Sequence, residues 1–310
     1  MIEVVELSKR YGDKQAVDTL SFTVRQGSIT GFLGPNGAGK STTMRAIVGL
    51  DRPTSGHIRI DGKPANQLTC PPRHVGALLD AKSVHTGRSA RDHLRALAAI
   101  SGVSNRRVDE MIELVGLGKV ARKRAGGFSL GMGQRLGIAS ALLADPGTLL
   151  LDEPVNGLDP DGVLWLRNLL KSLAAQGRAV LISSHLMSEV AVTADHLVVI
   201  GKGKLVADAP IDEFISSASR RSAIVRSPHL DVLRRVLVGD GVVVTDEDAE
   251  TVRVDGLSTA EIGDRALAAG AAVHELTPVR ASLEEAYMRA SKDNNEYVGA
   301  TAVQSPGEES

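Results

Sequence analysis

The feature that most constrains this chain is a glycine-rich run, GPNGAGKS, at residues 34–41. It fits the pattern G-x-x-x-x-G-K-[ST], the P-loop, which is believed only where a strand precedes it and a helix follows it. Both flanks have that character, because residues 27–33 read as a short buried strand and residues 42–50 as a helix. The run therefore predicts a strand–loop–helix unit that holds phosphate.

The residue types in the run explain how phosphate would be held. Its glycines let backbone N–H groups approach phosphate oxygens, and the helix that opens near Gly39 adds its positive end. Lys40 supplies a positive charge for the β- and γ-phosphates, and the Ser41 hydroxyl is placed to ligate Mg²⁺. The expected nucleotide contacts are Gly34, Pro35, Asn36, Gly37, Ala38, Gly39, Lys40, Ser41 and Thr42.

A second motif, LLLDE at residues 149–153, is an apolar strand that ends in two carboxylates. Asp152 can hold the Mg²⁺ shell opposite Ser41. Glu153, one residue on, points elsewhere and can polarise the attacking water as a general base. Alone, the pattern is an ordinary strand end with two solvated acids. Downstream of a P-loop and followed by residues 157–159 and His185, it favours ATP hydrolysis.

With these motifs in this order, residues 1–215 resemble the ATP-binding subunits of ABC transporters. The resemblance implies an α/β fold: a P-loop core with a mixed sheet, flanking helices and a helical subdomain at about residues 80–145. It also implies that Tyr11 stacks on adenine and that His185 senses the γ-phosphate. The catalytic residues expected on this basis are Lys40, Glu153 and His185.

The family's signature segment corresponds to residues 128–132, FSLGM, where the family usually has Leu-Ser-Gly-Gly-Gln. The resemblance implies that Ser129 and Gly131 contact the γ-phosphate bound to the opposite subunit of a dimer. It also places Asp159 in the segment that crosses the dimer interface. Leu130 is a departure that adds bulk where the family usually has no side chain, which calls the close backbone approach there into question.

A second departure follows the predicted strand at residues 74–79. The family places a glutamine after this strand, whereas this chain has Asp80. An aspartate still offers Mg²⁺ an oxygen ligand, but it adds a charge and has a shorter reach. We therefore expect the coupling to a membrane partner to differ in detail.

Composition limits the partners and the location of the chain. The 310 residues carry 36 basic and 37 acidic side chains, a formal net charge of −1. This balance gives no broad attraction to nucleic acid, and the basic run at residues 122–124 is only a local exception. The single Cys70 excludes an intrachain disulfide. No stretch approaches the roughly 18 apolar residues that span a bilayer, and residues 1–4 begin as a strand without a signal peptide.

Hydrophobic periodicity predicts where the elements of the first 215 residues lie. Strands are expected at 2–7, 17–24, 29–33 and 57–60, and helices at 90–101, 108–115 and near 136–143, the last carrying the signature segment at its start. Alternating strands and helices from 148 to about 206 predict a parallel sheet with covering helices.

A different pattern occupies residues 216–290 and predicts a small C-terminal α+β domain. A helix at residues 211–214 and the polar residues 216–222 are interpreted as the linker to it. Its order is β-α-β-β-α-β, which is typical of the ferredoxin-like arrangement. The strands are expected at 223–225, 242–245, 251–254 and 272–275, and the helices at 229–238, 258–269 and 281–290. The alternative is an extension of the ATPase core without a fold of its own. Residues 291–310 are polar and predict a disordered tail.

This C-terminal region resembles a particular group of exporter ATPases within the family. The segment LTPVRASLEEAY at residues 276–287 resembles the daunorubicin-resistance type of drug-exporter ATPases. The run SLGM with QRL, at residues 129–136, is a variant also seen in bacitracin- and lantibiotic-export relatives.

The resemblance implies a homodimer that sandwiches two ATP molecules with Mg²⁺ and energises a separately encoded integral-membrane permease at the cytoplasmic face of the membrane. The implied cargo is a drug or antibiotic. The alternatives are export of lipid or polysaccharide, a soluble ABC ATPase acting on ribosomes or DNA, and a regulatory module that holds ATP without turnover. One P-loop and the lack of sustained heptads count against the ribosome and DNA roles. The retained Lys40, Asp152, Glu153 and His185 count against the regulatory module.

Overall fold

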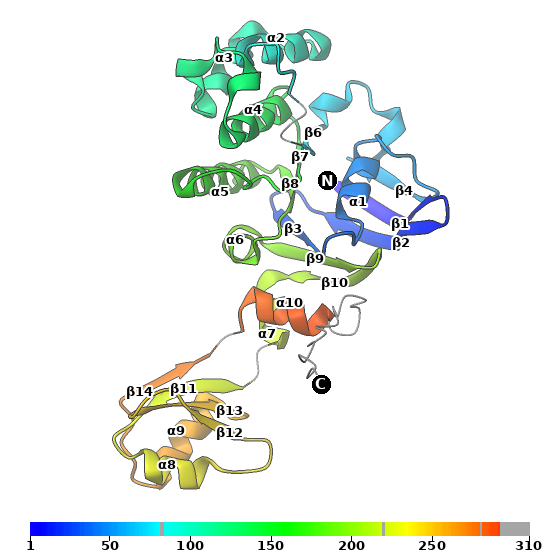
Figure 1. Cartoon of the computed structure of the whole chain (residues 1–310). Coiled ribbons are helices and arrows are strands. Elements are labelled where there is room, and N and C mark those ends of the chain that lie inside the picture. The colour runs from blue at the N-terminus through cyan, green and yellow to red at the C-terminus, as the bar shows by residue number, and fades with distance from the viewer. Residues whose placement is uncertain (81–83, 219–220, 280, 292–310) are drawn as a thin grey trace, which may run out of the picture.

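The computed structural model describes residues 1–80, 84–218, 221–279 and 281–291. Within these ranges the strands form three sheets (Figure 1). The first 215 residues contain two of the sheets and most of the helices. The third sheet lies apart from them, at the far end of the molecule from the helices α2 and α3.

A six-stranded mixed sheet forms the centre of the larger part, in the order β10-β9-β3-β8-β7-β6. Neighbouring strands from β9 to β6 are parallel, and β10 is antiparallel to β9. The strands are β3 (Ile29–Leu33), β6 (Val75–Leu78), β7 (Thr148–Leu151), β8 (Ala179–Ser183), β9 (His196–Gly201) and β10 (Lys204–Pro210). The arrangement confirms the predicted mixed sheet.

The central strands are apolar on both faces because each face packs against a separate core. In β7, Leu149 and Leu151 pack with the helices, whereas Leu150 packs on the opposite side. That opposite core is shared with an antiparallel sheet in the order β2-β1-β4-β5 and with α1. These elements are β1 (Ile2–Tyr11), β2 (Lys14–Val24), β4 (Ser55–Ile60), β5 (Lys63–Pro64) and α1 (Lys40–Ile47).

The predicted helical insertion comprises α2 (Ala90–Ser101), α3 (Asn105–Leu114) and α4 (Leu130–Leu142). The position expected for the third helix, near 136–143, was wrong, since α4 begins at Leu130. Ser129 caps this helix, and its hydroxyl accepts a hydrogen bond from the Met132 N–H at 3.2 Å. The cap outweighs the glycines of the segment, which favour a loop when taken alone. The signature segment therefore forms the first turn of α4.

Helices α5 (Pro160–Ala175) and α6 (Met187–Thr193) complete the helical side of the mixed sheet (Figure 1). Asp159 caps α5 by accepting a hydrogen bond from the Gly162 N–H at 2.9 Å. No helix of the described residues is long and apolar enough to cross a membrane.

The third sheet is antiparallel, in the order β12-β13-β11-β14. Its elements follow the expected β-α-β-β-α-β order: β11 (Ser222–Arg226), α8 (Leu230–Leu237), β12 (Val243–Asp246), β13 (Thr251–Asp255), α9 (Thr259–Ala268) and β14 (Glu275–Pro278). Apolar residues of the sheet and both helices form a core of their own.

Two predictions in this region were wrong. The last strand is Glu275–Pro278 rather than 272–275, because Ala272 is already bonded outside the sheet: its N–H donates to His229 and its carbonyl accepts from Ser227. The linker expected at 216–222 is shorter, since α7 (Ile211–Ala218) extends into it and β11 begins at Ser222.

The chain returns to the larger part after β14, through α10 (Leu283–Ser291). Leu283, Ala286 and Tyr287 of α10 are buried in the same core cluster as Ile211 and Phe214 of α7. Figure 1 shows α10 beside α7, below β10. The small sheet is therefore joined to the rest by two crossings of the chain. Of the tail expected at 291–310, residues 292 onward lie outside the described residues.

We expect Tyr287→Ala to lower the free energy of unfolding by about 3 kcal/mol, because it removes a large side chain from the core. Tyr287 is 7% exposed, whereas its neighbour Met288 is 55% exposed. Met288→Ala is the matched control and should change stability by less than about 0.5 kcal/mol. Urea unfolding followed by circular dichroism measures both, and equal losses would show that α10 is not anchored through Tyr287.

Candidate active site

The glycine-rich run forms a turn between the end of β3 and the start of α1, as a P-loop does. Gly37 and Gly39 have φ angles of 80° and 105°, in the left-handed region that favours glycine. A Cβ atom on Gly39 would also lie 2.5 Å from the Ala16 carbonyl oxygen. Only glycine fits there as the residue before α1, and the first backbone N–H groups of a helix have no partner within it, which makes the helix start an anion site.

Lys40, the first residue of α1, is buried with its ammonium group folded back over the loop. Its Nζ donates to the carbonyl oxygens of Gly34 at 2.5 Å and Pro35 at 3.2 Å. Burial lowers the pKa of Lys40, while the charges of Glu153 and Asp152 act in the opposite direction. A buried cation held by neutral carbonyls is a favourable partner for an anion in the loop.

Asp152 joins the P-loop helix to the carboxyl ends of the parallel strands. One of its oxygens accepts a hydrogen bond from the Ser41 hydroxyl at 2.9 Å, and the other accepts one from the Ser183 hydroxyl. Ser183 in turn accepts a bond from the Glu153 N–H at 3.0 Å. Sequence reasoning missed Ser183, although its place at the end of the strand beside β7 is a usable signal. The hydroxyl and carboxylate oxygens here suit a hard cation.

Glu153 turns away from Asp152 because of its backbone conformation. Its φ is +49°, which costs a residue with a side chain roughly 1–2 kcal/mol. The Gln134 side chain donates to the Glu153 carbonyl at 3.0 Å and so helps to hold this conformation. The Glu153 carboxylate meets His185, at 2.7 Å from Nδ1 and 3.2 Å from the backbone N–H. Strain held at such a place is typical of functional sites.

Tyr11 presents a half-exposed ring at the edge of the P-loop. Its hydroxyl donates to Asp51 at 2.8 Å, and Arg45 of α1 pairs with the same carboxylate oxygen at 2.8 Å. The Lys9 ammonium lies over the ring, 4.7 Å from its centroid. Sequence reasoning missed Asp51 and Arg45.

The surroundings of Tyr11 and Asp51 favour a protonated phenol and an ionised carboxylate. Burial, followed by the hydrogen bond and charge of Asp51, raises the pKa of the Tyr11 phenol. Hydrogen bonds from Arg45 and then from Tyr11 lower the pKa of Asp51. The phenol therefore stays protonated and the carboxylate ionised near neutral pH, which keeps the hydrogen bond that orients the ring.

One open cleft connects most of the predicted residues. Its lining is Tyr11, Lys14, Ala16, Asn36, Gly37, Gly39, Lys40, Ser41, Thr42, Asp152 and Glu153. Ser129 and Gly131, at the start of α4, do not line it. Asp80 also lies outside the lining, beyond the end of β6, whose Leu78 pairs with Leu151 of β7.

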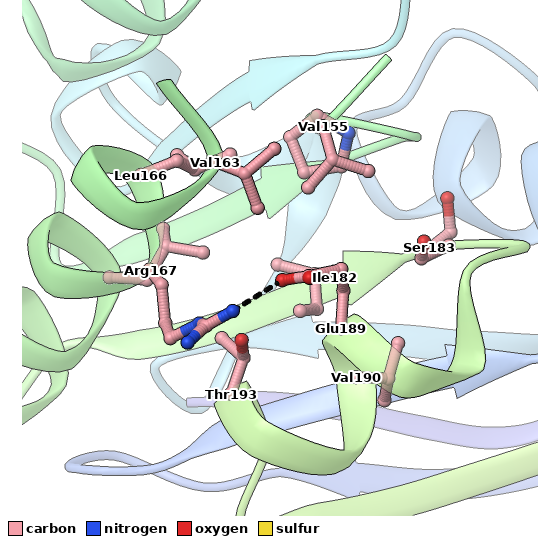
Figure 2. A pocket seen from close by; sticks show the side chains of 12 residues that line it. Val155, Val163, Leu166, Arg167, Ile182, Ser183, Glu189, Val190 and Thr193 are labelled. Carbon is pink, nitrogen blue, oxygen red and sulfur yellow. Dashed lines mark hydrogen bonds and ion pairs between the residues drawn. The ribbon is translucent and has the colours of Figure 1, made fainter. Parts of the chain in front are cut away.

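A small cavity lies between α5 and α6 (Figure 2), and its lining begins at Pro154, the residue after Glu153. Its lining is mainly apolar and includes Val155, Ile182 and Ser183. Arg167 of α5 pairs with Glu189 of α6 at 2.8 Å across one side of it. Because α6 begins two residues after His185, this ion pair links the position of α5 to that of the histidine.

Two family descriptions match the chain. The family described as ABC transporter matches residues 17–156, which contain the P-loop, the signature segment, Asp152 and Glu153. A domain of unknown function matches residues 221–284, the part that forms the third sheet.

The chain is 39% identical over 259 residues to the bacitracin transport ATP-binding protein BcrA of Bacillus licheniformis, covering 78% of this chain and 84% of that protein. It is 36% identical over 212 residues to the lantibiotic transport ATP-binding protein SrtF of Streptococcus pyogenes, covering 68% of this chain and 92% of that protein. This chain belongs to the ABC transporter ATP-binding proteins. The resemblance predicted from the motifs is thereby confirmed.

The fold of this ABC ATPase is also found in a solved cassette. The dimeric post-hydrolysis ATP-binding cassette MJ0796, bound to ADP and phosphate, aligns with a TM-score of 0.63 and 22% identity, covering 68% of this chain and 99% of that one. The aligned fold is the cassette core. As a member of the ABC transporter ATP-binding proteins, the chain binds and hydrolyses ATP, as its motifs predict.

We expect Tyr11→Ala to raise the KM of the ABC ATPase for ATP by about tenfold with a smaller change in kcat, because stacking on a base is worth roughly 1–3 kcal/mol. Tyr11→Phe keeps the ring but loses the bond to Asp51, so its KM should rise less. Steady-state kinetics of the two variants measure the difference. An unchanged KM in Tyr11→Ala would place the base elsewhere.

Proposed function

We propose that this ABC ATPase energises a separately encoded integral-membrane permease that exports a drug-like or antibiotic molecule. The observation that carries the catalytic part is the pair of adjacent carboxylates: Asp152 faces Ser41 of the P-loop, and Glu153 turns to His185. The names of the bacitracin and lantibiotic transport relatives support the choice of cargo.

The roles follow from where each group lies. The P-loop N–H groups and Lys40 bind the phosphates of ATP, and Tyr11 stacks on the base. Ser41 and Asp152 would hold Mg²⁺, which takes few protein oxygens and fills its remaining positions with water and phosphate oxygens. Bound there, Mg²⁺ would neutralise charge on the β- and γ-phosphates. On this proposal Asp80, two residues beyond the end of the neighbouring strand β6 and outside the lining of the cleft, would be a further oxygen ligand.

Hydrolysis then needs a base and an oriented water. The Glu153 carboxylate accepts a proton as the water oxygen attacks the γ-phosphorus and the bond to the ADP oxygen breaks. His185 holds the Glu153 carboxylate before ATP binds and steadies the γ-phosphate afterwards. Most of the rate enhancement comes from positioning and electrostatics, because phosphoryl transfer requires little covalent chemistry from the protein.

The second half of each site comes from another copy of the chain on this proposal. Ser129 and Gly131 start a helix outside the cleft of their own chain, and a helix N-terminus is an anion site. Two protomers arranged head to tail would place these residues against the γ-phosphate held by the partner. The dimeric cassette bound to ADP and phosphate supports this arrangement.

The same proposal places the protein at the cytoplasmic face of the membrane, attached through the permease. Residues 1–215 would act as the ATPase domain, with residues 80–145 as its helical subdomain. Residues 216–290 would form a separate small domain, which their own core and the match to a domain of unknown function support.

We expect Glu153→Gln to reduce turnover by at least about 100-fold, because the general base is lost. The variant should still bind ATP and should form a dimer with Mg²⁺-ATP, since the phosphate contacts remain. Phosphate release and sedimentation velocity measure the two effects. Lys40→Ala is the contrasting control, in which ATP binding itself is lost. Turnover equal to that of the wild type would remove Glu153 from its role.

Coexpression with a candidate permease tests transport. We expect cells that carry both proteins to tolerate a peptide antibiotic at a concentration at least about fourfold higher than cells that carry the permease with Glu153→Gln, because export requires turnover. Growth inhibition assays measure the difference. Equal tolerance across a panel of peptide antibiotics, with both proteins present in the membrane fraction, would contradict the proposed cargo class.

A further inference from the structure

Leu130, the departure in the signature segment, lies against Gly157. A Cβ atom built on Gly157 would overlap Cγ of Leu130 and would lie 2.5 Å from Cδ2 and 2.9 Å from Cβ. The φ of Gly157 is +77°, which disfavours any residue with a side chain. Gly157 is therefore needed for two reasons: its backbone conformation and the space that Leu130 takes.

The next residue of α4 contacts the same point. A Cβ on Gly131 would lie 2.5 Å from the Gly157 carbonyl oxygen. The first turn of α4 thus rests on Gly157 through two consecutive residues. From Gly157 the chain runs through Leu158 to Asp159, which caps α5. The contact therefore joins the beginnings of two helices.

The Leu130 side chain packs partly against its own protomer. Its side chain is 53% exposed, so about half of it is covered by its own protomer. The Ser129 hydroxyl still caps α4 through the Met132 N–H. Leu130 is thus accommodated without disturbing the cap that places Ser129 at the helix start.

We propose that Leu130 is a positioning residue that seats the start of α4 on Gly157. Residues 129–131 and 157–159 then move as one unit when two protomers close on ATP. This inference rests on the proposed two-protomer function. A rigid contact between the two segments means that the phosphate-facing helix start and the interface segment reach the partner together, which lowers the entropy lost on closure.

A double-mutant cycle in the Glu153→Gln background tests the contact. The dissociation constant of the Mg²⁺-ATP dimer is measured by sedimentation equilibrium for the parent, Gly157→Ala, Leu130→Gly and the double variant. Gly157→Ala should weaken the dimer at least about tenfold, because the new methyl group displaces Leu130. In the Leu130→Gly background, Gly157→Ala should raise the dissociation constant of the dimer by less than about threefold.

The chain offers a matched control for backbone strain. Gly177 has a φ of +90°, and a Cβ there would meet no atom within 4 Å. Gly177→Ala therefore carries the conformational cost without the clash and should change the dimer constant by less than about twofold. Binding of ATP to each variant as a monomer confirms that the P-loop is intact.

Leu130→Ala gives a second test if Gly157→Ala does not fold. It removes most of the contact between the Leu130 side chain and Gly157. The dissociation constant of the dimer should therefore rise by about fivefold, with little change in the affinity of the monomer for ATP. Leu164 of α5 is 50% exposed, similar to Leu130, so Leu164→Ala controls for loss of a half-exposed leucine. Equal effects of the two leucine variants would overturn the inference.

The remaining outcomes separate the inference from the proposed function. If Gly157→Ala weakens the dimer by the same factor with and without the Leu130 side chain, Leu130 does not position α4 on Gly157. The two-protomer function is unaffected by that result. If the Glu153→Gln parent forms no dimer with Mg²⁺-ATP, the two-protomer function and the inference both fail.

Discussion

The bonds to the Asp152 carboxylate are the interaction on which the site depends. Its two oxygens accept hydrogen bonds from Ser41 and Ser183, which belong to α1 and β8. Three segments far apart in the chain therefore converge on one carboxylate. Because a carboxylate accepts stronger hydrogen bonds than a neutral oxygen does, these bonds fix the P-loop helix relative to the parallel strands. Lys40 precedes Ser41 in the chain and Glu153 follows Asp152, so both lie next to these bonds.

Packed elements connect Glu153 to the segment on which Leu130 rests. Glu153 meets His185, α6 begins two residues later, and the Arg167–Glu189 pair joins α6 to α5. The start of α5 follows directly from the segment on which Leu130 rests. A conformational change at either place can thus reach the other through packed elements.

The small C-terminal sheet shows how a separate core can remain tied to the ATPase. Its residues bury one another, while α10 crosses back and buries Leu283, Ala286 and Tyr287 beside α7. Contacts of α10 extend to α6, the helix that follows His185. The return helix α10 therefore places the end of the described chain beside the helix that follows His185.

The sequence by itself determined the strand–loop–helix unit of the P-loop, the parallel strands with their covering helices and the β-α-β-β-α-β order, because local patterns specify each: glycines in a turn and the apolar periodicity of strands and helices. The mixed sheet was implied only by the family resemblance. The local patterns misplaced the start of α4, where the Ser129 cap prevails over local glycines, and the position of β14, where pairing with β11 decides. Only the tertiary structure brought Ser183 to Asp152, Asp51 to Tyr11 and Leu130 to Gly157. Such contacts join residues that are distant in the chain. They arise from the packing of whole elements against one another, so no local sequence pattern predicts them.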